Sequence, residues 1–131
     1  MYKNKNYGTT ILFTLPPSAN SCWRNVNGRT ILSAKYRQWK VENMPIGSEG
    51  VFCPNYPVSI SIVVRPGKKW RKCDLDNRIK PILDQLKNCK YLKDDNCDYV
   101  KAITIKLGQK ADKDFESYVE IDILKCEDLS L

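Results

Sequence analysis

Two segments alternate hydrophobic and polar residues with the period of a strand that buries one face. Residues 57–64 read Pro-Val-Ser-Ile-Ser-Ile-Val-Val, and residues 118–124 read Tyr-Val-Glu-Ile-Asp-Ile-Leu. Side chains two apart lie on the same side of a strand, so the Val, Ile and Leu positions predict a buried face in each segment. Glu120 and Asp122 are then expected on the face that meets water. Residues 9–15, stopped by Pro16-Pro17, and residues 99–107 are two further strand candidates.

Two other segments have helical spacing. Ser33 is a suitable N-cap for a helix over 34–43, in which Tyr36 and Trp39 are expected to be core residues rather than contact residues. A second helix is expected from Asp76 or Asn77 to about Cys89. Its apolar stripe consists of Ile79, Ile82, Leu83 and Leu86. Pro81 is tolerable because it lies in or near the first turn, where few backbone donors need a partner.

The remaining segments read as connections. Residues 18–28 are polar and are predicted to be irregular, and a loop with Pro45, Gly47 and Gly50 follows the first helix. No repeat or low-complexity stretch is present. The elements predict one domain over residues 1–131 of α/β (α+β) class, with a single mixed sheet and helices packed on it.

Composition indicates a class of partner only through charge. The 131 residues carry a net charge of +7, and seven of the 15 acids lie after residue 111, so the rest of the chain is more basic still. A strongly basic protein suits a polyanion such as nucleic acid, although a protein can also be basic without such a partner. No apolar run is long enough to span a membrane, and no signal segment follows the basic N-terminus, so a cytoplasmic protein is expected.

Cysteine and histidine usage narrows the chemistry. The six cysteines are expected to be reduced thiols, because no export signal is visible and no Cys-x-x-Cys pair suggests zinc. They are Cys22, Cys53, Cys73, Cys89, Cys97 and Cys126. The chain has no histidine, which excludes Ser-His-Asp and Cys-His nucleophiles. Catalysis would have to rest on carboxylates, lysines or tyrosines.

Candidate chemistry is concentrated where the second helix begins. If the chain before it is extended, Asp74 and Asp76 point to one side. Asp76, Lys80 and Asp84 are four apart and share a helical face. A second acidic pair, Asp94-Asp95, follows the helix. Converging carboxylates repel one another unless a cation neutralises them, and hard oxygen ligands favour Mg²⁺ or Mn²⁺.

Each part of this constellation also has a simpler explanation. Asp76 or Asn77 could only cap the helix. Lys80 and Asp84 could form a solvated ion pair. Asp94-Asp95 could be an ordinary turn.

At these residues the chain resembles the RusA-type family of Holliday junction resolvases, which occurs in bacteria and their phages. One part of the resemblance is Leu15-Pro16-Pro17-Ser18-Ala19-Asn20, followed by Trp23-Arg24 and the helix with Tyr36 and Trp39. The more specific part is the Asp-x-Asp-Asn-x-x-Lys pattern with the acids that follow it. It comprises Asp74, Asp76, Asn77 and Lys80, then Asp84-Gln85-Leu86 and Leu92-Lys93-Asp94-Asp95.

The resemblance implies a homodimeric, Mg²⁺-dependent endonuclease, with Mn²⁺ as a substitute, that cuts four-way DNA junctions by paired nicks in recombination and repair. It implies that Asp74, Asp76 and Asp95 bind the metal and that Lys80 is essential for cleavage. Asn77, Asp84 and Asp94 match as neighbours that orient these groups. The loop from Pro45 to Asn55 and the tail after Leu107 match nothing in the family pattern.

Basic residues just before the acids are candidates for DNA contact. Lys68, Lys69, Arg71 and Lys72 flank Trp70, which could stack on an unpaired base near a branch point. The alternative is a flexible charged loop with a partly buried tryptophan. Arg24 is a further candidate for phosphate contact, as are Lys35, Arg37 and Lys40 in the first helix.

Two rival functions stay open, and a third ranks last. The metal site would be the same in a nuclease that acts on other branched phage DNA. A basic DNA-binding protein without catalysis would be indifferent to Mg²⁺ apart from salt screening. A Mg²⁺ enzyme acting on a nucleotide ranks last because the chain lacks a phosphate-binding glycine loop.

Overall fold

The protein is built on a five-stranded mixed sheet. The computed structural model describes residues 2–5, 8–45, 53–112 and 114–126. The strand order is β1-β2-β7-β5-β6, and only the β5–β6 pair is parallel. The strands are β1 (Tyr2–Lys5), β2 (Gly8–Thr14), β5 (Val58–Arg65), β6 (Val100–Leu107) and β7 (Tyr118–Lys125). The four strands predicted from the sequence, which correspond to β2, β5, β6 and β7, are therefore confirmed.

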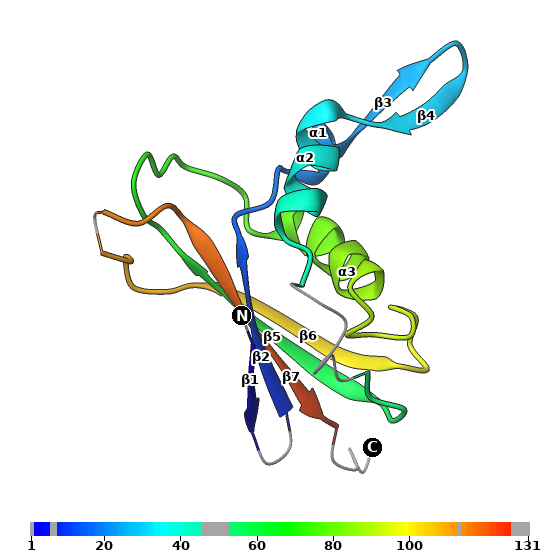
Figure 1. Ribbon diagram of the computed structural model, residues 1–131, viewed down its shortest axis with the longest axis vertical. Helices are drawn as coiled ribbons and strands as arrows, with labels where there is room; N and C mark the ends of the chain where they lie inside the picture. The colour runs from blue at the N-terminus through cyan, green and yellow to red at the C-terminus, as the bar shows by residue number, and fades with distance from the viewer. Residues whose placement is uncertain (1, 6–7, 46–52, 113, 127–131) are drawn as a thin grey trace.

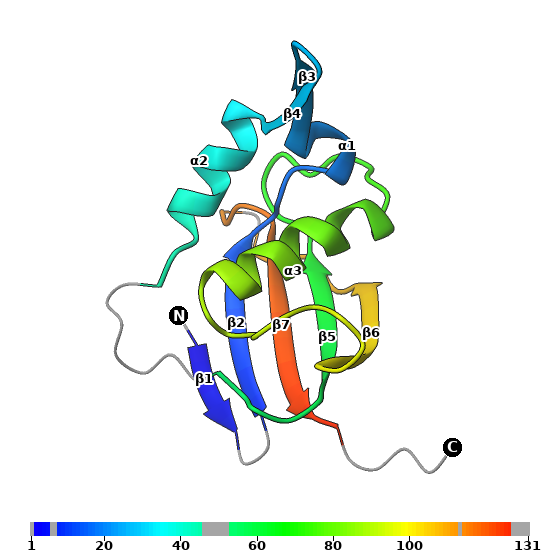
Figure 2. The ribbon, with the colours of Figure 1, turned by 90° about the vertical axis from the view of Figure 1, so that its right-hand side faces the viewer.

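One face of the sheet is covered by the helix α3 (Ile79–Asn88), which lies across the strands in Figure 2. Alternate residues of β5 and β7 are buried, with Ile62 and Ile121 both fully enclosed. The predicted apolar stripe of α3 packs on them through Ile82, Leu83 and Leu86. Burial of these side chains is the main force that holds the helix on the sheet, at roughly 1.5–3 kcal/mol for each large residue.

The outer face of β7 is polar, as its alternation predicted. Glu120 is half-buried and forms an ion pair with Arg65, whose Nε lies 3.1 Å from Oε1. Asp122 accepts a hydrogen bond from the Thr10 hydroxyl. These two acids are thus occupied in contacts between neighbouring strands, and they are not part of the candidate site.

Helix α2 (Ala34–Glu42) begins at the predicted cap. The Ser33 hydroxyl accepts a hydrogen bond from the backbone N–H of Tyr36 at 3.2 Å. Tyr36 and Trp39 are buried, so their assignment to the core is confirmed. The Trp39 indole N–H donates to the carbonyl of Thr14 at 2.9 Å, which ties α2 to the end of β2.

The prediction of an irregular segment over 18–28 was wrong. It contains a one-turn helix, α1 (Ala19–Cys22), and the first strand of a hairpin formed by β3 (Trp23–Val26) and β4 (Arg29–Leu32). The hairpin projects beyond the sheet (Figure 1). Asn27 and Gly28 both have positive φ, 51° and 78°, as an Asn-Gly hairpin turn requires. The strands are short and mostly exposed, so they lack the apolar alternation that would have revealed them.

The fold class is confirmed as mixed α and β, with the β3–β4 hairpin as a second, two-stranded sheet beside the main one. Gly47 and Gly50 of the predicted loop lie outside the described residues. Within the described ranges, no helix has the length and apolar character needed to cross a membrane.

Candidate active site

The candidate residues come from three consecutive segments around α3. Asp74 lies in the loop before it, and Asp76 opens a 3₁₀ turn, η1 (Asp76–Arg78), that leads directly into α3. After α3, Lys90 has a positive φ of 65° and the chain reverses. Tyr91 and Leu92 are buried, and both donate backbone hydrogen bonds to the carbonyl of Leu86. This anchoring places the loop that carries the second acidic pair against the side of the helix.

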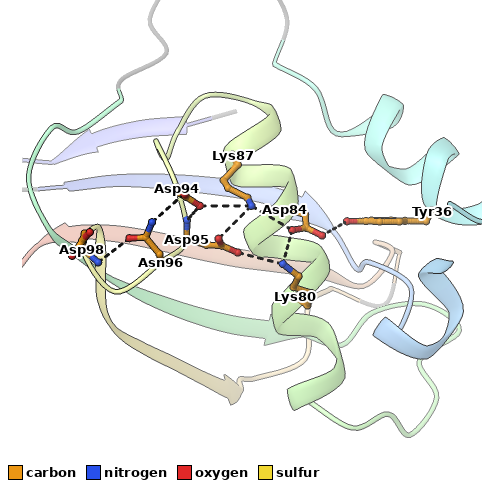
Figure 3. A network of polar contacts seen from close by, with 8 residues as sticks. All are labelled: Tyr36, Lys80, Asp84, Lys87, Asp94, Asp95, Asn96 and Asp98. Atoms are coloured by element: carbon orange, nitrogen blue, oxygen red, sulfur yellow. Dashed lines mark hydrogen bonds and ion pairs between the residues drawn. The ribbon is translucent and has the colours of Figure 1, made fainter. Parts of the chain in front are cut away.

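Lys80 and Lys87 project from α3 toward the returning loop (Figure 3). The Lys80 ammonium lies 3.1 Å from Asp84 Oδ1 and 3.4 Å from Asp95 Oδ2. Lys87 lies 3.3 Å from Asp95 Oδ1 and 3.9 Å from Asp84 Oδ1. Two lysines thus bridge the same two acids, which are 17% and 20% exposed. The helical spacing of Lys80 and Asp84 is confirmed, and the fold adds Asp95 to it.

These contacts keep both kinds of group charged. The hydrogen bond to Asp84 raises the pKa of Lys80 above its usual value, although burial opposes this. Burial alone would raise the pKa of Asp95, but hydrogen bonds from Lys87 and Asp94 and the charge of Lys80 together lower it. At neutral pH the cluster therefore presents an ammonium beside a carboxylate rather than a neutral pair.

The Asp94-Asp95 pair forms the turn that the simpler explanation predicted. The backbone N–H of Asp95 donates to Asp94 Oδ1 at 2.7 Å, and the Asn96 amide donates to Asp94 Oδ2 at 3.1 Å. Asp94 also lies 3.9 Å from Lys87. Asp94 therefore shapes the turn, while the side chain of Asp95 is left to face Lys80. The predicted role of Asp94 as an orienting neighbour stays a prediction.

Tyr36 connects helix α2 to this cluster. Its side chain is fully buried and its hydroxyl donates to Asp84 Oδ2 at 3.3 Å. Burial and the negative charge of Asp84 raise the pKa of Tyr36 far above its ordinary value, so the hydroxyl stays protonated. The Lys40 ammonium lies 5.0 Å from the centre of the same ring. Asp84 is thus held from two sides, by the two lysines of its own helix and by a tyrosine 48 residues away.

Lys87 and the Tyr36 hydroxyl were missed as participants in the site. Lys87 is three residues after Asp84 and seven after Lys80, so helical spacing alone could have placed it on the same face. Nothing in the local sequence signals the Tyr36 contact, because it joins two helices that pack only in the folded protein.

Asp74 and Asp76 are both exposed, and neither is paired with a lysine or arginine in the described part of the chain. The Asn77 amide lies 3.5 Å from Asp74 Oδ2, the limit of a hydrogen bond. Leu75 has helical angles, φ −65° and ψ −40°, so the extended conformation that would have aligned the two carboxylates is absent. Neither η1 nor α3 has a side-chain N-cap bond, which argues against capping as the purpose of Asp76 or Asn77.

The described residues contain no group of three acids or cysteines close enough together to hold a metal ion. The structure brings Asp95 to Lys80, but it does not gather Asp74, Asp76 and Asp95 into such a group. Their assignment as metal ligands stays a prediction. Mg²⁺ is commonly held by only one or two protein carboxylates together with waters and substrate phosphates. Exposed carboxylates such as those of Asp74 and Asp76, with no cation partner in the described residues, have the donor chemistry for that kind of site.

The basic loop before Asp74 is held against the protein. Gly67 accepts no side chain, because a Cβ there would lie 2.3 Å from the carbonyl oxygen of Phe115. The backbone N–H of Lys68 donates to that same carbonyl at 2.6 Å, and Lys69 has a positive φ of 62°. These contacts attach the first half of the loop to the segment that contains Phe115.

Further along this loop, Trp70 is half-buried and packs against the core. It lines a shallow hollow of about 420 Å³ with Lys72, Asp74 and Leu107. Lys68, Lys69, Arg71 and Lys72 are exposed. Arg24 is also exposed but lies on β3, in the projecting hairpin. DNA contact by these six residues stays a prediction.

A protein-family model described as Endodeoxyribonuclease RusA matches residues 14–123. The matched range begins at the last residue of β2 and ends within β7, and it includes η1, α3 and every acid and lysine of the candidate site. No curated protein matches the chain.

Proposed function

The chain belongs to the RusA endodeoxyribonuclease family, and from this we propose that it is a Mg²⁺-dependent endonuclease that resolves four-way DNA junctions by paired nicks, acting in the cytoplasm in recombination and repair. The observation that carries the proposal is the pairing of Lys80 with Asp95. A cation and an acid that are 15 residues apart in the sequence meet at 3.4 Å, and Lys80 belongs to the same family motif as the exposed acids Asp74 and Asp76. A protein that only bound DNA would not need an acidic site, because carboxylates repel phosphate.

Lys80 is the residue proposed to contact the phosphate that is cut. Its side chain is 53% exposed, and an ammonium has three hydrogen-bond donors. Two are directed to Asp84 and Asp95, so one is left for a phosphate oxygen. Because its pKa is raised, Lys80 would remain charged and could stabilise negative charge that develops on the phosphate during cleavage.

Asp74, Asp76 and Asp95 are the proposed metal-binding residues. Bound Mg²⁺ would lower the pKa of a water molecule and stabilise the charge of the phosphate. The chain's own contribution is to hold Asp95 in place through the two lysines and to leave Asp74 and Asp76 exposed toward DNA. Asn77, Asp84 and Asp94 would orient these groups through the hydrogen bonds and ion pairs of the cluster.

A homodimer is proposed with this function. A four-way junction has two-fold symmetry, and two matching nicks need two active sites related by the same symmetry. The supporting argument is the symmetry of the substrate together with family membership. Sedimentation equilibrium of the free protein would measure the mass of the assembly directly.

The test is cleavage of a labelled four-way junction, with linear duplex and a three-way fork beside it, with and without Mg²⁺. Asp76→Asn should abolish cleavage while junction binding persists, because it removes an anionic ligand and keeps the side-chain shape. Asp98→Asn is the matched control, since Asp98 is also exposed and joins the network of Figure 3 only through its backbone N–H, which donates to Asn96 at 2.9 Å. Preferred cleavage of the fork would indicate a nuclease for other branched DNA.

Tight junction binding without cleavage in any divalent metal would refute the nuclease and leave a DNA-binding protein. Cleavage by Asp76→Asn at the wild-type rate would refute the assignment of Asp76 while leaving the nuclease intact.

A further inference from the structure

A second feature of the molecule, separate from the acidic cluster, is a cleft of about 490 Å³ at the end of the sheet where β2 stops. Pro16 and Trp39 are among the residues that line it. One wall is α2, which stands off this end of the sheet in Figure 2. The other wall is the start of the basic loop, with Lys68 and Lys69.

Basic side chains converge on this cleft from three separate elements. Lys35 comes from α2, Lys68 and Lys69 from the loop after β5, and Arg78 from η1. Two acids, Glu42 and Glu116, also line it. In the described part of the chain none of the four cations forms an ion pair, although acids lie in the same cleft. Because these four side chains form no ion pair with the acids of the cleft, their positive charge is available to an anionic ligand.

Two further details suggest that the cleft is built for a ligand. Arg78 donates from Nη1 to the carbonyl of Pro16, but its buried Nε has no acceptor among the described residues. A buried donor without a partner is costly. Lys69 is held in the left-handed region, at φ 62°, a conformation that costs energy for a residue other than glycine and is found disproportionately at functional sites. Both groups border the same cavity.

We propose that this cleft binds the phosphates of one DNA strand next to the place of cleavage. The proposal rests on the proposed function and adds to it the path of the strand. Arg78 ends the same 3₁₀ turn that Asp76 begins, so a strand held in the cleft would run directly to the acidic site. The volume is typical of a pocket for a small ligand, which suits a short stretch of one strand and not a whole duplex.

The proposed contacts are to phosphate and not to bases. Trp39 is the one aromatic residue that lines the cleft among the described residues, and it is only 5% exposed, so it offers no open face for stacking. Lysines positioned as point charges neutralise phosphates without reading sequence. Their contribution to affinity should therefore appear as salt dependence, because each neutralised phosphate releases counterions.

The experiment compares two double variants that lose the same charge. Lys35→Gln with Lys69→Asn removes two cations from the cleft, and asparagine tolerates a positive φ better than most residues. Lys101→Gln with Lys106→Gln removes two exposed cations of β6, which do not line the cleft. Binding of a labelled four-way junction is measured by fluorescence anisotropy in EDTA across a range of salt concentrations, after circular dichroism has confirmed folding.

For each protomer that contacts the junction, the cleft variant should make the slope of log affinity against log salt shallower by about 1.4–1.8 and should lower affinity at 0.1 M salt by about 25- to 60-fold. The β6 variant should change the slope by less than half as much. Equal effects of the two variants would overturn the cleft proposal.

Cleavage in Mg²⁺ separates this outcome from the fate of the proposed function. If the wild type cuts junctions but the two variants bind alike, only the cleft proposal fails. If the wild type binds with the cleft-dependent slope but never cuts, the nuclease fails and the cleft stands. A wild type that binds no DNA would overturn both.

Discussion

Replacing Lys80 by methionine should separate catalysis from stability at the candidate site. The substitution keeps an unbranched side chain of similar length on α3 and removes the ammonium. In the folded protein that ammonium contacts Asp84 at 3.1 Å and Asp95 at 3.4 Å. The question is whether Lys80 is only a surface ion pair or also a contact to the phosphate that is cut.

The contacts of Lys80 predict that Lys80→Met lowers the stability of the fold only slightly. The pair with Asp84 has helical i, i+4 spacing and contributes about 0.3–0.5 kcal/mol, and an exposed pair such as that with Asp95 contributes about 0.2–1 kcal/mol. Lys87 still lies 3.3 Å from Asp95 after the substitution, which limits the repulsion between the acids. The free energy of unfolding should therefore fall by about 0.5–1.5 kcal/mol, a decrease in Tm of roughly 2–6 °C for a domain of this size.

The expected cost for cleavage is much larger. Loss of one preorganised donor to developing charge typically lowers kcat by about 100- to 1,000-fold, or roughly 2.7–4 kcal/mol. Single-turnover cleavage of a labelled four-way junction at saturating protein gives the rate, and urea unfolding gives the stability. Lys87→Met is the control on the same helix: it should cost similar stability, but with a smaller loss of cleavage.

A Lys80→Met protein that cuts junctions within tenfold of the wild-type rate would refute a phosphate contact and leave Lys80 as an ion pair. If Lys87→Met lost as much cleavage as Lys80→Met, neutralisation of the acids would explain the effect in both. A loss of stability far above about 1.5 kcal/mol, the upper sum for two exposed ion pairs, would mean that the fold around α3, and not the chemistry, depends on Lys80.

Three other predictions concern stability and reactivity. The pKa of Asp95 is lowered from 3.8 in the folded protein, so the stability that its charged form contributes is complete above the unfolded-state pKa and is lost as pH falls through the folded value. Urea unfolding should show this loss of stability at acid pH for the wild type and not for Asp95→Asn. The same pH dependence in both proteins would contradict the pairing. Gly67→Ala would place a Cβ 2.3 Å from the Phe115 carbonyl oxygen and should lower stability by about 1–3 kcal/mol, whereas a variant as stable as the wild type would show that the loop can shift. Burial raises the pKa of Cys22 and Cys89 to about 11, so iodoacetamide at pH 8 should alkylate them only after unfolding, as mass spectrometry of labelled peptides would show; rapid labelling in the native protein would contradict their burial.

Periodicity was sufficient for the elements that bury one face. The alternation in β5 and β7 and the stripe on α3 each report which side chains avoid water, and burial confirms them. The Ser33 cap was equally local, because a cap needs only the next three residues. By contrast, the β3–β4 hairpin buries little, so its sequence signal is the Asn27-Gly28 turn and not a hydrophobic pattern.

For the site, the sequence by itself determined which residue types were available: acids and lysines at helical spacing in a chain without histidine, in a pattern that resembles one nuclease family. Only the tertiary structure decided which of them meet. Asp95 reaches Lys80 because the chain reverses at Lys90 and is anchored on Leu86, and Tyr36 reaches Asp84 because two helices pack across 48 residues. Local spacing describes the face of one element, whereas contacts between elements depend on chain reversal and packing, which no single segment encodes.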